Sequence, residues 1–171
     1  MSYYVLVATA GHDTVGSASS GAMLTLLQHP EQFQKLRDNP ELLPLALDEA
    51  TRWITPTKHF MRTATEDFEI RGQTIKKGES VMLMYASGNR DEEVFNDASE
   101  FQVDRRPNRH LAYGFGVHHC MGHMLAKMEM KALYSQILKR LTDIELVGDE
   151  AWIESYWVTG LKTLPIRYKV K

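Results

Sequence analysis

The chain has 171 residues, of which 43% are hydrophobic and 25% are charged, and its formal net charge is −2. This length supports one compact domain with its own core, and the lack of a basic excess argues against a nucleic-acid-binding protein. No apolar run is long enough to cross a bilayer, so no membrane association is expected. Because there is one cysteine and no basic segment precedes an apolar run at the start, we expect neither an intrachain disulfide nor a signal peptide, and a cytoplasmic location fits best.

Three helices are predicted in the first third of the chain. The first begins almost at the first residue and carries apolar side chains from Tyr4 to Leu27. Pro30 favours the start of the second helix, and Asn39-Pro40 ends it. The predicted ranges are 3–28, 30–37 and 44–53.

Short strands and an irregular segment are predicted next. Gly72 and Lys77-Gly78 supply turns between runs that are rich in strand-forming residues. The predicted strands are 61–64, 68–71, 73–75 and 81–85. Residues 87–112 are polar with little periodicity, which indicates an irregular but ordered loop.

A second long helix is predicted from about Met121 to Leu141, and residues 144–170 are predicted to form β-hairpins. Five residues are expected to form one apolar face of this helix: Leu125, Met128, Leu133, Ile137 and Leu141. The predicted fold class is therefore mainly α with small β-sheets at the side, in a single domain.

The beginning of the chain leads directly into an apolar helix. Such a helix exposes a face that requires a partner. We therefore expect the chain to be a truncated part of a longer protein and to self-associate when it is alone.

The strongest chemical signal is residues 113–122, YGFGVHHCMG, which surround the single cysteine, Cys120. A cysteine at a helix N-terminus faces unpaired backbone N–H groups, which favour the thiolate. Gly114 and Gly116 allow a tight loop, and Gly122 removes a side chain where a flat ligand could lie close. A thiolate is a strongly electron-donating ligand for haem iron.

This segment resembles the cysteine loop of cytochromes P450, whose pattern is F-G-x-G-x-[HR]-x-C-x-G. Tyr113 departs from the pattern, because Phe is usual at this position. The resemblance implies that haem b binds here, with Cys120 as the ligand of the iron and Tyr113, Gly114, Phe115, His118 and Gly122 around it. It covers essentially all 171 residues and identifies the chain as the C-terminal, haem-binding part of the P450 fold, without the N-terminal half.

Glu49 and Arg52 form an E-x-x-R pair on one predicted helix face. Such pairs are usually solvated. The resemblance instead implies a buried structural triad that is completed by Arg105, in which the charged groups hold the irregular loop.

The segment Ala10-Gly11-His12-Asp13-Thr14 allows two interpretations. One is a helix that ends at Gly11 and is followed by an Asp cap. The resemblance implies instead the distal helix of the family, in which Thr14 bonds the carbonyl one turn back and locally opens the helix. Asp13 and Thr14 would then be the catalytic residues that deliver protons on the oxygen side of the haem.

By match to the family, Arg62 and His118 are the expected anchors of the haem propionates. Arg62 has the alternative of being an ordinary exposed strand arginine. The second alternative, which concerns His118, is a zinc or copper cluster formed with neighbouring side chains. Its members would be His110, His118, His119, Cys120 and His123.

The resemblance implies a haem-dependent monooxygenase that hydroxylates a C–H bond with O₂. The segments 60–64 and 108–111 are most similar to the terpineol-hydroxylating branch, which suggests a small apolar, terpenoid substrate near Thr57, Phe60 and residues 156–160. The expected electron donor is an iron–sulfur ferredoxin that meets Arg109 and Lys127. Two alternatives stay open for this chain: a haem-binding module without catalysis, and a haem-free, self-associating unit.

Overall fold

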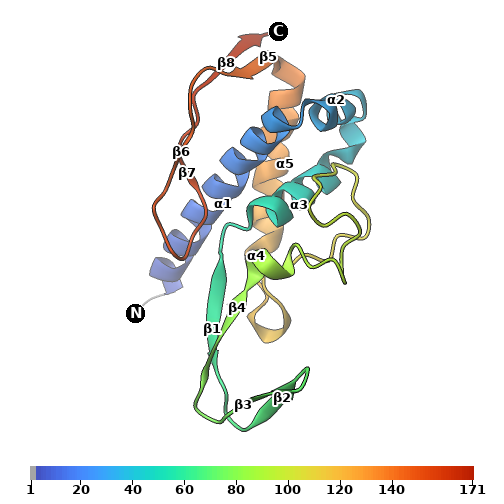
Figure 1. Ribbon diagram of the computed structural model, residues 1–171. Coiled ribbons are helices and arrows are strands. Elements are labelled where there is room, and N and C mark those ends of the chain that lie inside the picture. Colours follow the sequence, from blue (N-terminus) through green and yellow to red (C-terminus); the bar gives the residue numbers. More distant parts are fainter. Residues whose placement is uncertain (1–2) are drawn as a thin grey trace.

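In a computed structural model, which describes residues 3–171, helices form the centre of the molecule and small two-stranded sheets lie at its edges (Figure 1). The α-helices are α1 (Tyr3–Gln28), α2 (Pro30–Asp38), α3 (Leu43–Ile54), α4 (Tyr85–Gly88) and α5 (His123–Arg140). Two short 3₁₀ helices, η1 (Pro40–Leu42) and η2 (Gly116–His118), precede α3 and α5. The mainly α fold class is confirmed. None of the described helices is long and apolar enough to cross a membrane.

The eight strands of the described residues form four antiparallel pairs. They are β1 (His59–Thr63), β2 (Phe68–Ile70), β3 (Gln73–Ile75), β4 (Ser80–Met84), β5 (Leu141–Leu146), β6 (Ala151–Trp152), β7 (Leu161–Thr163) and β8 (Ile166–Val170). β1 pairs with β4 and encloses the β2–β3 hairpin, while β5 pairs with β8 and encloses the β6–β7 pair. The turns at Gly72 and Gly78 have positive φ, 76° and 87°, which glycine adopts at little cost.

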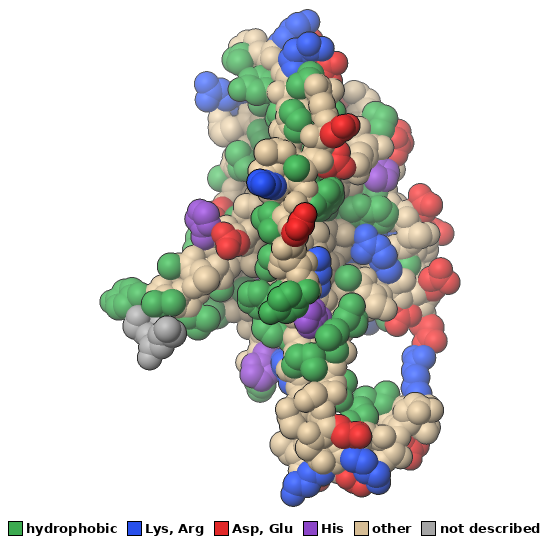
Figure 2. Space-filling model, turned by 60° about the vertical axis from the view of Figure 1, so that its left-hand side comes forward, with side chains coloured by type: hydrophobic (Ala, Val, Ile, Leu, Met, Phe, Trp, Pro, Cys, Tyr) green, Lys and Arg blue, Asp and Glu red, His purple; other side chains and the backbone are tan. Residues whose placement is uncertain are grey.

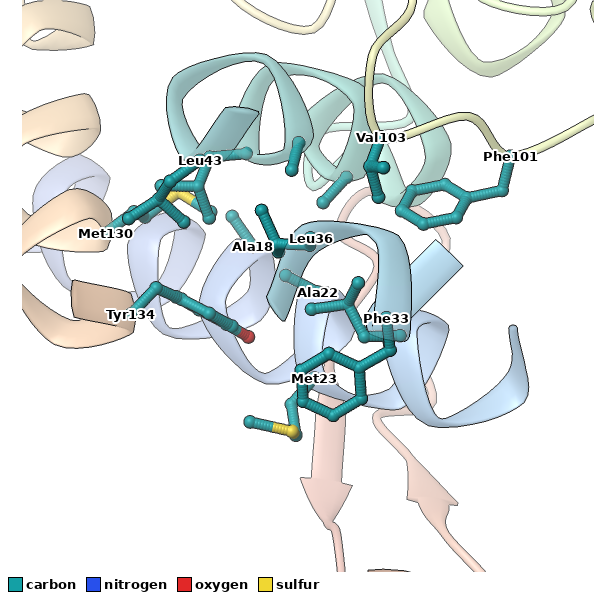
Figure 3. Packing of buried hydrophobic residues seen from close by; sticks show 14 residues of the cluster. Ala18, Ala22, Met23, Phe33, Leu36, Leu43, Phe101, Val103, Met130 and Tyr134 are labelled. Atoms are coloured by element: carbon teal, nitrogen blue, oxygen red, sulfur yellow. The ribbon is translucent and has the colours of Figure 1, made fainter. Parts of the chain in front are cut away.

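Buried side chains from α1, α2, α3 and α5 and from the irregular loop meet in one core (Figure 3). Ala18 and Ala22 let α1 approach its neighbours closely, and the backbone at Gly21 packs against Ile54 of α3. On the other side of α1, the Tyr134 hydroxyl of α5 donates to the carbonyl of Ser19 at 2.6 Å. The second half of α1 is therefore fixed by three helices.

The apolar face that we predicted for α5 is only partly correct: Ile137 packs against the core, whereas three other members of the face do not. Leu125, Met128 and Leu133 are 47–64% exposed, whereas Met130 and Tyr134 are 1% exposed. The helix is oriented by the side chains that fit against α1 and α3 and by the hydroxyl bond of Tyr134. The helix also begins at His123 and not at Met121, and Leu141 starts β5 instead of ending the helix.

The first half of α1 projects from the body of the molecule and carries apolar side chains (Figure 2). Tyr4 and Leu6 are 81% and 60% exposed. The predicted range of this helix is confirmed, and so is the expected exposure of its apolar residues.

One smaller difference lies within residues 80–112. The strand expected over 81–85 ends at Met84, because Tyr85 begins the short helix α4, whose turn is closed by the Asn89 N–H bonding the Tyr85 carbonyl at 2.8 Å. The rest of the segment is irregular, as predicted, and contains a cis peptide bond before Pro107.

Candidate functional site

The cysteine loop is a closed turn between the irregular segment and α5. Gly114 and Gly116 have φ of 71° and 64°, a region that side chains disfavour. The Cys120 N–H donates to the carbonyl of Tyr113 at 2.8 Å, and the His119 N–H donates to that of Gly116 at 3.0 Å. These bonds fold the segment back on itself and fix the backbone at Cys120.

Cys120 is exposed and free of any disulfide. It lies three residues before the first residue of α5, slightly farther from the helix than predicted. Its carbonyl is within 2.8 Å of His123 Nδ1, which links the loop to the first turn of the helix. A Cβ at Gly122 would lie 3.9 Å from the Cys120 sulfur, so glycine keeps the space beside the sulfur open.

The surroundings of Cys120 fit a flat apolar group with a soft metal ion. Phe115, Val117 and Met121 are 83%, 97% and 73% exposed, an unusual set of apolar side chains around an exposed cysteine. A bound haem would cover such side chains, and the thiolate of Cys120 would bind its iron. The residues present therefore fit haem b.

The two expected propionate anchors lie on separate elements. Arg62 is half-buried in β1, where Nη1 donates to the carbonyl of Met61 at 2.8 Å. His118 is exposed at the end of η2. Their role as anchors stays a prediction.

Within residues 3–171, no group of three or more His, Cys, Asp or Glu side chains is arranged to hold a metal ion. Three of the histidines, His110, His119 and His123, instead pack near Tyr113. Its ring centroid lies 5.5 Å from that of His110 and 6.0 Å from that of His123, and His119 and His123 pack edge to face at 4.5 Å. The arrangement is one of aromatic packing.

Tyr113 also lines a cavity of about 260 Å³ between α3 and α5, together with Asp48 and Lys127. Burial raises the pKa of its phenol to about 12, so the phenol stays protonated. Burial also lowers the pKa of His110 to about 4, so this imidazole is neutral at pH 7. The sequence carried no signal for this partly buried polar cluster, because its members come from three separate segments.

The segment that we expected on the distal side lies inside α1, which is continuous from Tyr3 to Gln28. The interpretation of a helix end with an Asp cap is therefore wrong. Thr14 Oγ1 donates to the carbonyl of Ala10 at 2.7 Å, as expected, but the helix is not opened there. The carboxylate of Asp13 is exposed and lies 2.9 Å from His12 Nδ1.

The structure brings Glu49, Arg52 and Arg105 together in the interior. Arg52 binds both carboxylate oxygens of Glu49 at 2.8 Å, and Arg105 Nε lies 3.0 and 3.1 Å from the same two oxygens. All three side chains are at most 4% exposed. The solvated alternative for Glu49 and Arg52 is therefore wrong.

The remaining N–H groups of the two arginines bind backbone carbonyls of the irregular segment. Arg52 donates to Asn89 and Ala98 at 2.7 and 2.9 Å. Arg105 donates to Asp97 and Glu100 at 2.9 and 2.7 Å. Sequence reasoning missed Asn89, whose side chain donates to Thr55 Oγ1 and accepts from the Leu111 N–H. A buried asparagine in a polar loop gives no pattern that could have revealed it.

The two segments expected on the substrate side lie against each other. Thr57 and Val158 form an isolated β-bridge, and Trp157 Nε1 donates to the carbonyl of His59 at 3.1 Å. The rings of Phe60 and Trp157 pack edge to face at 5.8 Å. The result is an aromatic surface that is partly exposed.

Comparison with known proteins agrees with this geometry. The Cytochrome P450 family model matches residues 4–170. Cytochrome P450-terp of a Pseudomonas species is 49% identical over 97% of this chain, and a biotin biosynthesis cytochrome P450 of Bacillus subtilis (strain 168) is 38% identical over 96%. The chain spans 39% and 42% of the lengths of these two relatives.

Solved structures of the same family also match. CYP108D1 from Novosphingobium aromaticivorans matches with a TM-score of 0.93 and 43% sequence identity. The match includes 99% of this chain and 41% of the CYP108D1 chain. P450BioI, in complex with an acylated acyl carrier protein, matches with a TM-score of 0.94 and 38% sequence identity. The match includes 96% of this chain and 43% of the P450BioI chain. Members of this family bind haem b and are monooxygenases. From its cysteine loop, its fold and these matches, the chain belongs to the cytochrome P450 family.

Proposed function

We propose that the chain is the C-terminal, haem-binding part of a P450 monooxygenase. Its reaction would place one atom of O₂ into a C–H bond of the substrate, while the other leaves as water with two protons and two electrons. The observation that carries the proposal is the exposed Cys120 in a glycine-bounded loop among exposed apolar side chains. When bound, the haem would supply oxygen activation at a thiolate-ligated iron.

Three groups of residues would serve this reaction. Cys120 would bind the iron, with Arg62 and His118 at the propionates. Thr14 and Asp13 would hold and move protons. The Thr14 hydroxyl donates its hydrogen bond to the carbonyl of Ala10, so the lone pairs of Oγ1 remain available to accept a hydrogen bond from a water molecule.

The triad of Glu49, Arg52 and Arg105 would hold the irregular loop ahead of Cys120. Its support is the set of carbonyls that the two arginines bind between residues 89 and 100. We assign these three residues a structural role and no part in the chemistry.

For the substrate, we infer a small apolar molecule, terpenoid in class. The similarity to P450-terp and the aromatic surface of Phe60 and Trp157 support this class. Tyr156 is 87% exposed and extends the same surface, where its ring packs near that of His59. Burial of an apolar substrate against these rings would be favourable.

For the electrons, we infer an iron–sulfur ferredoxin that approaches from the side of the cysteine loop. Of the two cations that we expected to meet it, Lys127 already pairs with Asp48 at 2.8 Å. Arg109 is exposed and forms no ion pair within residues 3–171, so it is the better candidate for an acidic partner. A cytoplasmic location is consistent with such a donor and stays a prediction.

The alternative function is a haem-binding or haem-free unit that self-associates without catalysis. The exposed apolar residues at the start of α1 favour it for the chain alone, because such surface drives association. The two functions differ in whether a thiolate-ligated haem supports turnover.

The test is the absorption spectrum of the haem-loaded, reduced protein with carbon monoxide. We expect a thiolate-type spectrum that Cys120→Ala and Cys120→His abolish and that the loop variant Val117→Ala retains. An unchanged spectrum in either cysteine variant would remove Cys120 as the ligand. Turnover with a ferredoxin and its reductase then separates a catalytic chain from a binding module.

A further inference from the structure

At the end of the loop between β6 and β7, a glycine packs against α1. Gly160 is buried, and a Cβ placed on it would lie 2.4 Å from Ser17 Oγ and 3.3 Å from Ser17 Cβ. Ser17 itself is only 7% exposed. Ser17 Oγ ends a rotatable side chain and can turn away, but Ser17 Cβ and Ile153 Cδ1 both lie 3.3 Å from the added Cβ. A side chain larger than a methyl group at Gly160 would therefore push the loop away from α1.

The same loop is held on its other side by the segment that leads into β1. The Lys58 N–H donates to the carbonyl of Trp157 at 2.9 Å, and the Thr159 N–H donates to that of Pro56 at 2.8 Å. Across the loop, the Ile153 N–H donates to the carbonyl of Gly160 at 2.9 Å. The loop is thus fixed between α1 and β1, as its course beside α1 in Figure 1 also shows.

The contact lies close to the residues that we place on the oxygen side. Ser17 follows Thr14 by three residues on the same helix, and Trp157 precedes Gly160 by three residues in the loop. Because α1 is continuous from Thr14 to Ser17, and only two residues separate Trp157 from Gly160, we expect a change in the contact between Ser17 and Gly160 to move this part of the loop relative to Thr14.

We propose that Gly160 and Ser17 are positioning residues that determine substrate specificity. They would do so by fixing the width of the space between α1 and the loop of residues 153–160, called the aromatic loop here because it carries Tyr156 and Trp157. The proposal rests on the monooxygenase function proposed above. Neither residue needs to touch the substrate. A small change in this contact changes which apolar molecules fit, because a displacement of about 1 Å is enough to alter binding and reactivity substantially.

The first test measures amide hydrogen exchange in the loop between β6 and β7, using the chain of 171 residues without haem. In Gly160→Ala and the larger Gly160→Val, the amides of Ile153 and Thr159 should exchange about ten-fold faster or more, because their bonds depend on the seated loop. The double variant Gly160→Ala with Ser17→Ala removes the 2.4 Å contact between the new Cβ and Ser17 Oγ, and the nearest remaining atoms lie at 3.3 Å. The exchange rates of the two amides should therefore return toward those of the parent protein.

The control variant is Gly16→Ala, since a Cβ at Gly16 meets nothing within 4 Å on the same helix. It should leave both amides unchanged. Unchanged exchange in both Gly160 variants, or equal exchange in the single and double variants, would overturn the proposed contact.

The second test measures ligand size selection in the haem-loaded protein. Imidazole is small and binds the iron, whereas 4-phenylimidazole also needs space near the loop. In Gly160→Val the affinity for 4-phenylimidazole should change about ten-fold while that for imidazole stays the same. A displaced loop with unchanged selection would overturn the specificity role. Absence of a thiolate-type haem spectrum in the parent would instead count against the proposed function, and the exchange test would still decide on the contact.

Discussion

Arg105 reaches across 56 residues of sequence to Glu49, and its Nε lies about equally far, 3.0 and 3.1 Å, from the two carboxylate oxygens. Arg52 binds the same carboxylate from the neighbouring turn of α3. One buried carboxylate therefore faces two guanidinium groups, and its loss would leave two cations in the interior without a counter-charge.

We predict that Glu49→Ala lowers the free energy of unfolding by about 3–5 kcal/mol, because it leaves buried charge unpaired. The matched control is Glu145→Ala, which removes a partner of Arg167 that is 54% exposed, and it should cost about 0–1 kcal/mol. Denaturant midpoints of both variants decide this prediction. Equal losses would mean that the buried network contributes no more than a surface pair.

We predict that Thr14→Ala uncouples oxygen consumption from product formation in an active, complete enzyme that carries this chain. The Thr14 hydroxyl is the group that we assign to proton transfer, and its loss should release peroxide instead of product. Ser20→Ala is the control, since Ser20 makes the same kind of bond, to the carbonyl of Gly16 at 2.8 Å, six residues farther along α1. Peroxide and product are measured together, and unchanged coupling in Thr14→Ala would remove this residue from the proton path.

We predict that the protein loses stability as the pH falls from about 7 to about 4. His110 has its pKa lowered to about 4 by burial, while the unfolded chain titrates near 6.5. Between these values the unfolded state binds more protons, so stability rises with pH across this window and is lost as the pH decreases. The contribution is on the order of 3 kcal/mol.

The variant His110→Asn tests this assignment. Its side-chain oxygen could still accept the Ala112 N–H, which His110 Nδ1 accepts at 3.3 Å, but it does not titrate. Its unfolding midpoint should depend less on pH between 4 and 7 than that of the parent. His12→Asn, which changes an exposed histidine, should leave the dependence unchanged. An identical pH dependence in parent and His110→Asn would show that His110 does not contribute.

We predict that the chain alone self-associates through the projecting half of α1. Replacing Tyr4 and Leu6 with Ser should reduce association, because their exposed apolar surface drives it. Val94→Ser is the control, as Val94 is 53% exposed but lies in the irregular segment. Light scattering at several concentrations measures the effect. A strictly monomeric parent chain would contradict the prediction.

Local sequence determined the parts of the protein that were predicted well. The turns at Gly72 and Gly78 and the bounds of the first helix depend on neighbouring residues alone, and they are confirmed. The cysteine loop is likewise local, since its bonds join residues 113–120. The buried face of α5 depends instead on which side chains α1 accepts, and Tyr134 is selected by a carbonyl 115 residues away in sequence. No periodicity within the helix contains that information.

The same reason explains what was missed in the site. The contact between Gly160 and Ser17 and the burial of His110 exist only once distant segments have met. By contrast, the pairing of Glu49 with Arg105 was expected, because the family pattern already carries that tertiary information.

The nesting of the C-terminal strands links the end of the chain to the aromatic loop. β8 pairs with β5, and the β6–β7 pair that bears the loop lies between them in sequence. A chain that stopped at Pro165 would keep every residue of the loop but would lose the strand that closes its base. Such a C-terminal truncation should therefore loosen the contacts of Trp157 and Gly160, although the deleted residues lie in a different sheet.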